Sequence, residues 1–163
     1  MSLILHRMTL FTLLMSLALP LSANTLSGRV TITDGDTVRL DNGTAIRLWG
    51  VDAPELSQTC ENRVGRTVPC GLWSAYQLET RFGGQHWECR YQGKHGERVV
   101  AHCFADGLDI NAHVARQGWA VATPRFTRQF EQEARLAKQE RRGLWEGSFE
   151  EPWRYRQRHP SRF

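Results

Sequence analysis

Four carboxylate side chains lie at two predicted turns or strand ends in the first third of the chain. Asp34 and Asp36 flank a glycine between two strand-like segments, and Asp52 and Glu55 follow the end of a third such segment. A rigid scaffold commonly presents ligand-binding and catalytic side chains at turns and strand ends of this kind. Aspartate also forms turns by itself, without any ligand. The placement therefore predicts a site lined by carboxylates, with simple turn formation as the alternative.

The elements that would position these carboxylates are short strands. Alternating and β-branched residues predict strands over residues 29–33, 36–40 and 45–51, joined by turns at Asp34-Gly35 and Asp41-Asn42-Gly43. Arg47 and Asp52 are five positions apart, so strict alternation places their side chains on opposite faces of the third strand. Both can reach one site only if the strand breaks or bulges between them, and Gly50 is the residue best suited to that.

The rest of the chain mixes helices with further strands. Residues 53–69 are predicted to form a loop, and apolar residues at steps of three and four predict a helix over 72–82. The sequence then predicts strands at 86–91 and 98–104, a helix at 110–117 capped by Asp109, an extended segment at 119–122 and a last helix at 127–142. About five strands, most of them joined as hairpins, suit a small and partly open barrel such as an oligonucleotide-binding barrel.

Several segments resemble the thermonuclease family, also called staphylococcal or micrococcal nuclease-like. The first two are Asp34-Gly35-Asp36-Thr37 and Arg47-Leu48-Trp49-Gly50-Val51-Asp52-Ala53-Pro54-Glu55. Three more follow in the same order: Gly96-Glu97-Arg98-Val99-Val100-Ala101, the pair Asp109-Ile110-Asn111 and Ala115-Arg116-Gln117-Gly118-Trp119-Ala120, and Arg142-Gly143-Leu144-Trp145. The resemblance implies an α+β fold, a five-stranded oligonucleotide-binding barrel with about three helices. It also implies a calcium-dependent phosphodiesterase that acts on DNA and RNA.

The resemblance implies a role for each residue of the motif. The Asp36 and Asp52 side chains and the Ala53 carbonyl would bind Ca²⁺, Asp34 would tune that site, Glu55 would be the general base, and Arg47 and Arg98 would hold the phosphate. The chemistry is consistent, because Ca²⁺ prefers oxygen ligands, guanidinium groups grip phosphate oxygens in pairs, and a carboxylate can activate water. The implied products carry 3′-phosphate and 5′-hydroxyl ends.

Each of these residues also has an ordinary structural interpretation. Arg47 could be an exposed strand arginine, Arg98 could pair with Glu88 or Glu97 across a hairpin, and Glu55 could simply open a loop. The second arginine motif also departs from the family pattern, since Gly96 stands one position early and Glu97 occupies the usual glycine position. Ala53 stands where the family often has threonine, a change that a backbone ligand tolerates.

The two ends of the chain are predicted to lie outside the nuclease-like domain. Residues 1–23 contain Arg7, the apolar stretch Met8–Leu19 and a break at Pro20, a pattern typical of a secretory signal peptide. An uncleaved anchor is the alternative, although a bilayer span needs ~20 apolar residues. We expect a nuclease domain at 24–153 and an arginine-rich tail at 154–163, which is interpreted as a solvated end or as a contact to nucleic acid backbone.

The four cysteines follow the predicted signal peptide. Cys60, Cys70, Cys89 and Cys103 contain no C-x-x-C pair, so a zinc ribbon is not favoured. An even number in an exported chain favours two disulfides. Of the three possible pairings we prefer Cys60–Cys70 within a short loop and Cys89–Cys103 across a hairpin. Four reduced and buried thiols are the alternative.

Composition narrows the class of protein without deciding it. A hydrophobic fraction of 40% excludes a disordered chain, and a net charge of +4 is too small to identify a polyanionic partner. Of the 21 Lys and Arg residues, all but Lys94 and Lys138 are arginine, the better phosphate ligand, although codon bias would give the same excess. We expect a secreted or periplasmic monomeric nuclease whose partner is its nucleic acid substrate. The alternative is a catalytically silent nucleic-acid-binding barrel of the cell envelope.

Overall fold

The computed structural model describes residues 24–160, and these form a closed five-stranded barrel with helices beside it. The barrel strands are β1 (Thr25–Ile32), β2 (Thr37–Leu40), β3 (Ala45–Leu48), β7 (His86–His95) and β8 (Arg98–Ala105). They are hydrogen-bonded in the order β3-β2-β1-β7-β8, and a parallel β3–β8 pairing closes the ring. The expected α+β oligonucleotide-binding barrel is confirmed. The predicted signal peptide at 1–23 lies outside the described residues.

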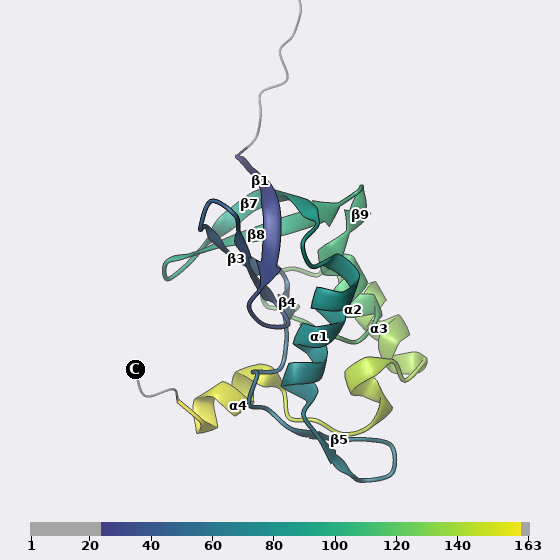
Figure 1. Ribbon diagram of the computed structural model, residues 1–163. Coiled ribbons are helices and arrows are strands. Elements are labelled where there is room, and N and C mark those ends of the chain that lie inside the picture. The colour runs from purple at the N-terminus through teal and green to yellow at the C-terminus, as the bar shows by residue number, and fades with distance from the viewer. Residues whose placement is uncertain (1–23, 161–163) are drawn as a thin grey trace, which may run out of the picture.

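Short strand pairs and helices surround this barrel. The minor strands are β4 (Val51–Asp52), which pairs with β10 (Val121–Ala122), the hairpin of β5 (Cys60–Glu61) and β6 (Thr67–Val68), and β9 (Leu108–Asp109), which pairs antiparallel with the end of β8. The helices of residues 24–160 are α1 (Cys70–Phe82), α2 (Ile110–Arg116), α3 (Glu131–Gln139), the 3₁₀ helix η1 (Gly143–Glu146) and α4 (Pro152–Arg158). None of the helices in this part of the chain is long and apolar enough to cross a membrane. Figure 1 shows the barrel at one end of the molecule and α4, in yellow, at the other.

Alternating strand residues fill the barrel interior. Val38, Ile46 and Leu48 are fully or almost fully buried, and Trp87 of β7 packs edge-on against Phe82 of α1. Helix α1 begins at Cys70, two residues earlier than predicted, and its buried residues are Cys70, Gly71, Ser74, Leu78 and Phe82. The predicted face included Leu72, which is exposed. The apolar periodicity was correct near the end of this helix, but its register was wrong at the start.

The other differences concern element boundaries. Asp109 caps α2 as predicted, accepting a hydrogen bond from the Ala112 amide at 2.9 Å. Helix α3 is shorter than the predicted 127–142, because the backbone of Phe130 is not helical (φ −105°, ψ 12°) and Arg141 adopts a φ of +52° after the end of the helix. The predicted loop at 53–69 contains the β5–β6 hairpin. The expected domain boundary between residues 153 and 154 falls inside α4.

Both preferred disulfides are present, so the alternative of four reduced thiols is wrong. Cys89 and Cys103 are direct cross-strand partners of β7 and β8, with their Cα atoms 4.0 Å apart. Cys60 and Cys70 join the β5–β6 hairpin to the start of α1, with a Cα separation of 5.6 Å. Cys89–Cys103 therefore links two barrel strands, and Cys60–Cys70 links the loop after Glu55 to α1.

Replacing both Cys60 and Cys70 by Ala should lower the free energy of unfolding by about 2–3 kcal/mol, because the unfolded chain regains the entropy of an open loop. The corresponding double replacement of Cys89 and Cys103 should cost more, since both side chains are fully buried and the closed loop is longer. Urea denaturation followed by circular dichroism measures both. Equal losses in the free energy of unfolding, or a larger loss for the Cys60 and Cys70 variant, would contradict this ranking of the two disulfides.

Candidate active site

The candidate site is a cleft of about 870 Å³ that runs along β2 and β3, from the Asp34–Asp36 turn to the hairpin that joins the two strands. Its lining includes six of the seven residues that the motif predicted: Asp34, Asp36, Arg47, Ala53, Glu55 and Arg98. The seventh, Asp52, lines an adjoining cavity of about 830 Å³ that shares Arg47 with the first. The structure thus brings together residues that are up to 64 positions apart in the chain, between Asp34 and Arg98.

The Asp34–Asp36 turn supplies one buried carboxylate and one turn-forming carboxylate. Asp34 Oδ1 accepts a hydrogen bond from the Asp36 amide at 2.9 Å, so for Asp34 the turn-forming role is present. Asp36 instead points into the protein and is 2% exposed. Gly35 is required between them, because a Cβ there would lie 2.2 Å from Ser74 Oγ of α1. The turn can therefore pack against α1 only with glycine at this position.

Arg47 joins Asp36 to the end of the next strand. Its Nη1 lies 2.9 Å from Asp36 Oδ1, and its Nη2 lies 2.6 Å from Asp52 Oδ1. Arg47 is therefore not a free surface arginine, and its side chain is largely covered. Asp36 Oδ2 accepts a further hydrogen bond from the Ala53 amide at 2.9 Å. These contacts fix the carboxylates of Asp36 and Asp52 on the same side of the barrel.

A break in the third predicted strand makes the contact between Arg47 and Asp52 possible. The spacing of five residues between them required such a break. β3 ends at Leu48 and β4 begins at Val51, with Gly50 between them at a φ of +75°. Such a φ favours glycine, because other residues crowd their own Cβ there. The break rotates Asp52 onto the side occupied by Arg47. The expected break at Gly50 is confirmed.

Arg98 reaches the cleft from β8. Its Nη1 lies 3.5 Å from Thr37 Oγ1, and Thr37 in turn donates to Asp36 Oδ1 at 2.9 Å. Its Nη2 lies 3.3 Å from His95 Nδ1. Burial and the Arg98 guanidinium lower the pKa of His95, which favours the neutral ring that can accept this hydrogen bond. Arg98 thus contacts Thr37 and His95, and not Glu88 or Glu97.

Arg156 is a site residue that the motif did not predict. From α4 it contacts Asp52 and Glu55, with Nη1 2.9 Å from Asp52 Oδ1 and 2.9 Å from Glu55 Oε1. Although burial lowers it, these hydrogen bonds raise the pKa of Arg156 above the ordinary arginine value. The only sequence signal was the spacing of Arg154, Arg156 and Arg158 in the predicted tail. That tail is therefore not a solvated end at Arg156.

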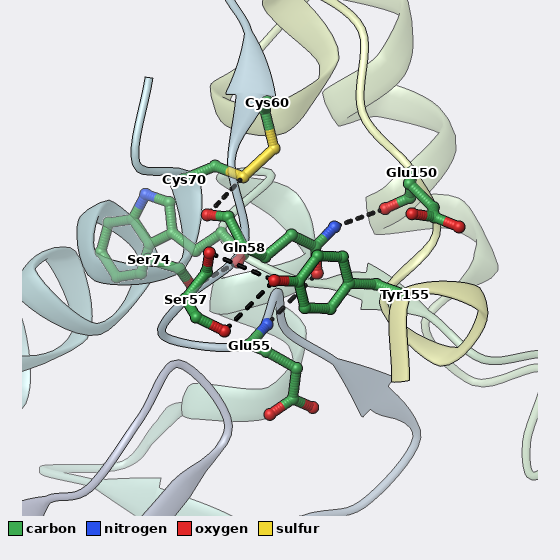
Figure 2. Close-up of a disulfide and its surroundings, with 9 residues drawn as sticks. Glu55, Ser57, Gln58, Cys60, Cys70, Ser74, Glu150 and Tyr155 are labelled. Carbon is green, nitrogen blue, oxygen red and sulfur yellow. Dashed lines mark hydrogen bonds between the residues drawn. A yellow bond between two sulfur atoms is a disulfide. The ribbon is translucent and has the colours of Figure 1, made fainter. Parts of the chain in front are cut away.

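Gln58 is a second residue that sequence reasoning missed. It is fully buried in the loop after Glu55, and its Oε1 accepts a hydrogen bond from the Glu55 amide at 3.3 Å. Its Nε2 donates to the Glu150 carbonyl at 2.7 Å (Figure 2). A polar residue inside a predicted loop gives no periodic signal, so nothing in the sequence distinguished Gln58 from its exposed neighbours.

The surroundings of Asp36 disfavour a negative charge on its carboxylate. Burial and the carboxylates of Asp34 and Asp52 raise the pKa of Asp36 to about 7, against the opposing effect of Arg47. Within residues 24–160 no three His, Cys, Asp or Glu side chains are arranged as a ready metal cluster. The donors themselves fit Ca²⁺, because carboxylate and carbonyl oxygens are its preferred ligands and a cation would relieve the repulsion at Asp36.

Residues 45–147 match the family model described as staphylococcal nuclease homologue. The chain belongs to this family. The matched part of this nuclease homologue contains Arg47, Asp52, Ala53, Glu55 and Arg98, whereas the Asp34–Asp36 turn precedes the match and α4 follows it. No curated protein matches the chain at a significant level. Membership of this family indicates that the protein is a nuclease-type hydrolase.

Replacing Gly50 by Ala should destabilise this nuclease homologue by about 2–4 kcal/mol, because the positive φ and the crowding of a new Cβ add together. A Cβ at Gly50 would lie 2.4 Å from Thr127 Cγ2 and 2.8 Å from Phe130 Cε2. The matched control is Gly43→Ala, where φ is also positive but no heavy atom lies within 4 Å. It should lose only about 1 kcal/mol. Equal losses in chemical denaturation would show that crowding at Gly50 is not important.

Proposed function

We propose that the protein is a calcium-dependent phosphodiesterase that hydrolyses DNA and RNA. The convergence of Arg47, Arg98, Glu55 and Asp36 on one cleft, with Asp52 held to Arg47 in the adjoining cavity, carries this proposal. Two guanidinium groups and a water-accessible carboxylate are the groups that hydrolysis of an anionic phosphodiester needs, besides a cation. A silent binding barrel would need none of these residues together.

The residues divide the work of hydrolysis among them. Arg47 and Arg98 bind the phosphate oxygens and stabilise the charge that develops on them in the transition state. Glu55, whose side chain is 40% exposed, accepts the proton of the attacking water. Ca²⁺ held by Asp36, Asp52 and the Ala53 carbonyl would supply Lewis-acid stabilisation of a phosphoryl oxygen, and Asp34 would tune this site. The resemblance to the thermonuclease family supports expulsion of the 5′ oxygen, leaving 3′-phosphate and 5′-hydroxyl ends.

We also propose that the protein works outside the reducing cytoplasm, either secreted or in the periplasm. The two disulfides support this location, because such bonds persist in oxidising compartments and are rare in reducing ones. The predicted signal peptide at residues 1–23 supports it independently of the structure.

Glu55→Gln should lower the rate of plasmid digestion by the purified protein at least ~10²-fold, because the general base is lost. A calcium chelator should abolish digestion by the unchanged protein. Glu88→Gln is the matched control, since Glu88 is an exposed carboxylate on β7 outside the cleft, and it should digest normally. Full digestion by Glu55→Gln would overturn the role of Glu55, and digestion unaffected by chelator would overturn the role of Ca²⁺. Product ends carrying only 5′-phosphate would refute the proposed bond cleavage.

Glu97→Gly should raise the turnover of long DNA about two- to fivefold at low salt, because Glu97 lines the cleft and repels an anionic strand. The gain should shrink as salt screens the repulsion. Glu97→Gln separates the effect of charge from that of backbone freedom and should reproduce most of the gain. An unchanged or lower rate for both variants would show that this carboxylate does not oppose the substrate.

A further inference from the structure

Helix α4 is held against the loop that carries Glu55. The Tyr155 hydroxyl donates to the Ser57 carbonyl at 3.2 Å and lies 3.2 Å from the Ser57 hydroxyl. Gln58 Nε2 donates to the Glu150 carbonyl, just before the helix, at 2.7 Å. Figure 2 shows the hydrogen bond from Gln58 to Glu150 and the contacts of Tyr155 with Ser57. The position of α4 relative to Glu55 is therefore fixed by hydrogen bonds that do not involve Arg156.

Because Tyr155 is held in this way, the next residue, Arg156, lies against the carboxylates of Asp52 and Glu55. The guanidinium of Arg156 spans both oxygens of Asp52, with Nη1 2.9 Å from Oδ1 and Nη2 2.9 Å from Oδ2. Its Nη1 also lies 2.9 Å from Glu55 Oε1. A two-pronged contact of this kind is among the strongest that a carboxylate makes with a side chain. Arg156 thus holds one proposed metal ligand and the proposed general base at once.

The same contact opposes a divalent cation at Asp52. The Asp52 carboxylate is 4% exposed, and Arg47 also contacts its Oδ1 at 2.6 Å. A cation bound to Asp52 would lie a few ångströms from a guanidinium with little water between them, where like charges repel strongly. Resting on the proposed function, we propose that Arg156 is the resident counter-ion of this site and competes with Ca²⁺ for Asp52. Binding of the cation moves Arg156 away from Asp52 and releases Glu55.

Arg156, and not Arg47, is the group that gives way. Arg47 extends from β3, which is hydrogen-bonded to β2 on one side and β8 on the other, and its side chain is 17% exposed. Arg156 extends from the seven-residue helix α4, and its side chain is 39% exposed. Water therefore solvates a displaced Arg156 guanidinium more readily than that of Arg47, whose side chain is less exposed. Because Arg156 and the cation compete for Asp52, each weakens the contact of the other by the same factor. Removing the Arg156 charge must therefore strengthen cation binding.

The test is the affinity of the full chain for Ca²⁺ alone, measured by isothermal titration calorimetry without nucleic acid. Arg156→Gln should bind Ca²⁺ about tenfold more tightly than the unchanged protein. Arg154→Gln is the matched control, because it removes the same charge from the same helix at a residue that stacks on Trp153 and does not contact Asp52 or Glu55. It should bind as the unchanged protein does.

Each other outcome overturns the proposal. Equal or weaker binding by Arg156→Gln shows that Arg156 does not compete with the cation, and leaves the proposed nuclease function intact. Equal tightening by both variants shows an effect of net charge alone. Absence of Ca²⁺ binding in all three proteins overturns the calcium site of the proposed function together with this inference.

Folding of the variant is checked by circular dichroism. If Arg156→Gln does not fold, Arg156→Met replaces it. Methionine also removes the charge and keeps an unbranched side chain, so this variant should also bind Ca²⁺ more tightly than the unchanged protein. Unchanged or weaker binding by Arg156→Met overturns the proposal in the same way.

Discussion

The guanidinium of Arg47 lies between two buried carboxylates, and the geometry of the cleft depends on this contact. Asp36 and Asp52 are 2% and 3% exposed, and burying such groups without a cation is strongly unfavourable. Arg47 pairs with Thr37 of β2 and Val100 of β8, so its backbone is held on both sides by the barrel. Closure of the barrel and assembly of the site are therefore the same structural event.

The negative charges of the cleft carboxylates are balanced by arginines that come from separate parts of the chain. Arg47 and Arg98 belong to barrel strands, whereas Arg156 belongs to a helix that follows the family match. The barrel cations are held by strand pairing, and the helix cation is held mainly by the docking of Tyr155 and Gln58. In the proposed exchange, Arg156 can therefore leave Asp52 without disturbing the arginines proposed to bind phosphate.

Much of the fold and of the motif could be predicted from local sequence. The turns at Asp34-Gly35 and Asn42-Gly43, the break at Gly50 and the cap at Asp109 each depend on residues within a few positions of one another. The disulfide Cys89–Cys103 followed from the predicted hairpin. Local sequence was less informative where burial decides the outcome, as in α1, where Cys70 and Gly71 are buried and Leu72 is exposed.

The sequence by itself determined the barrel class, the carboxylate turns and the requirement for a strand break between Arg47 and Asp52. Only the tertiary structure decided that Asp36 would be buried while Asp34 closes a turn, and that Arg156 would contact Asp52 and Glu55. The reason is separation along the chain, because the contact of Arg156 with Asp52 joins residues 104 positions apart. Helix α4 has no apolar stripe from which its packing position could be predicted. The residues that hold it, Gln58 and Ser57, lie in a segment without a periodic pattern. Position in such a case is fixed by long-range hydrogen bonds, which leave no local signal in the sequence.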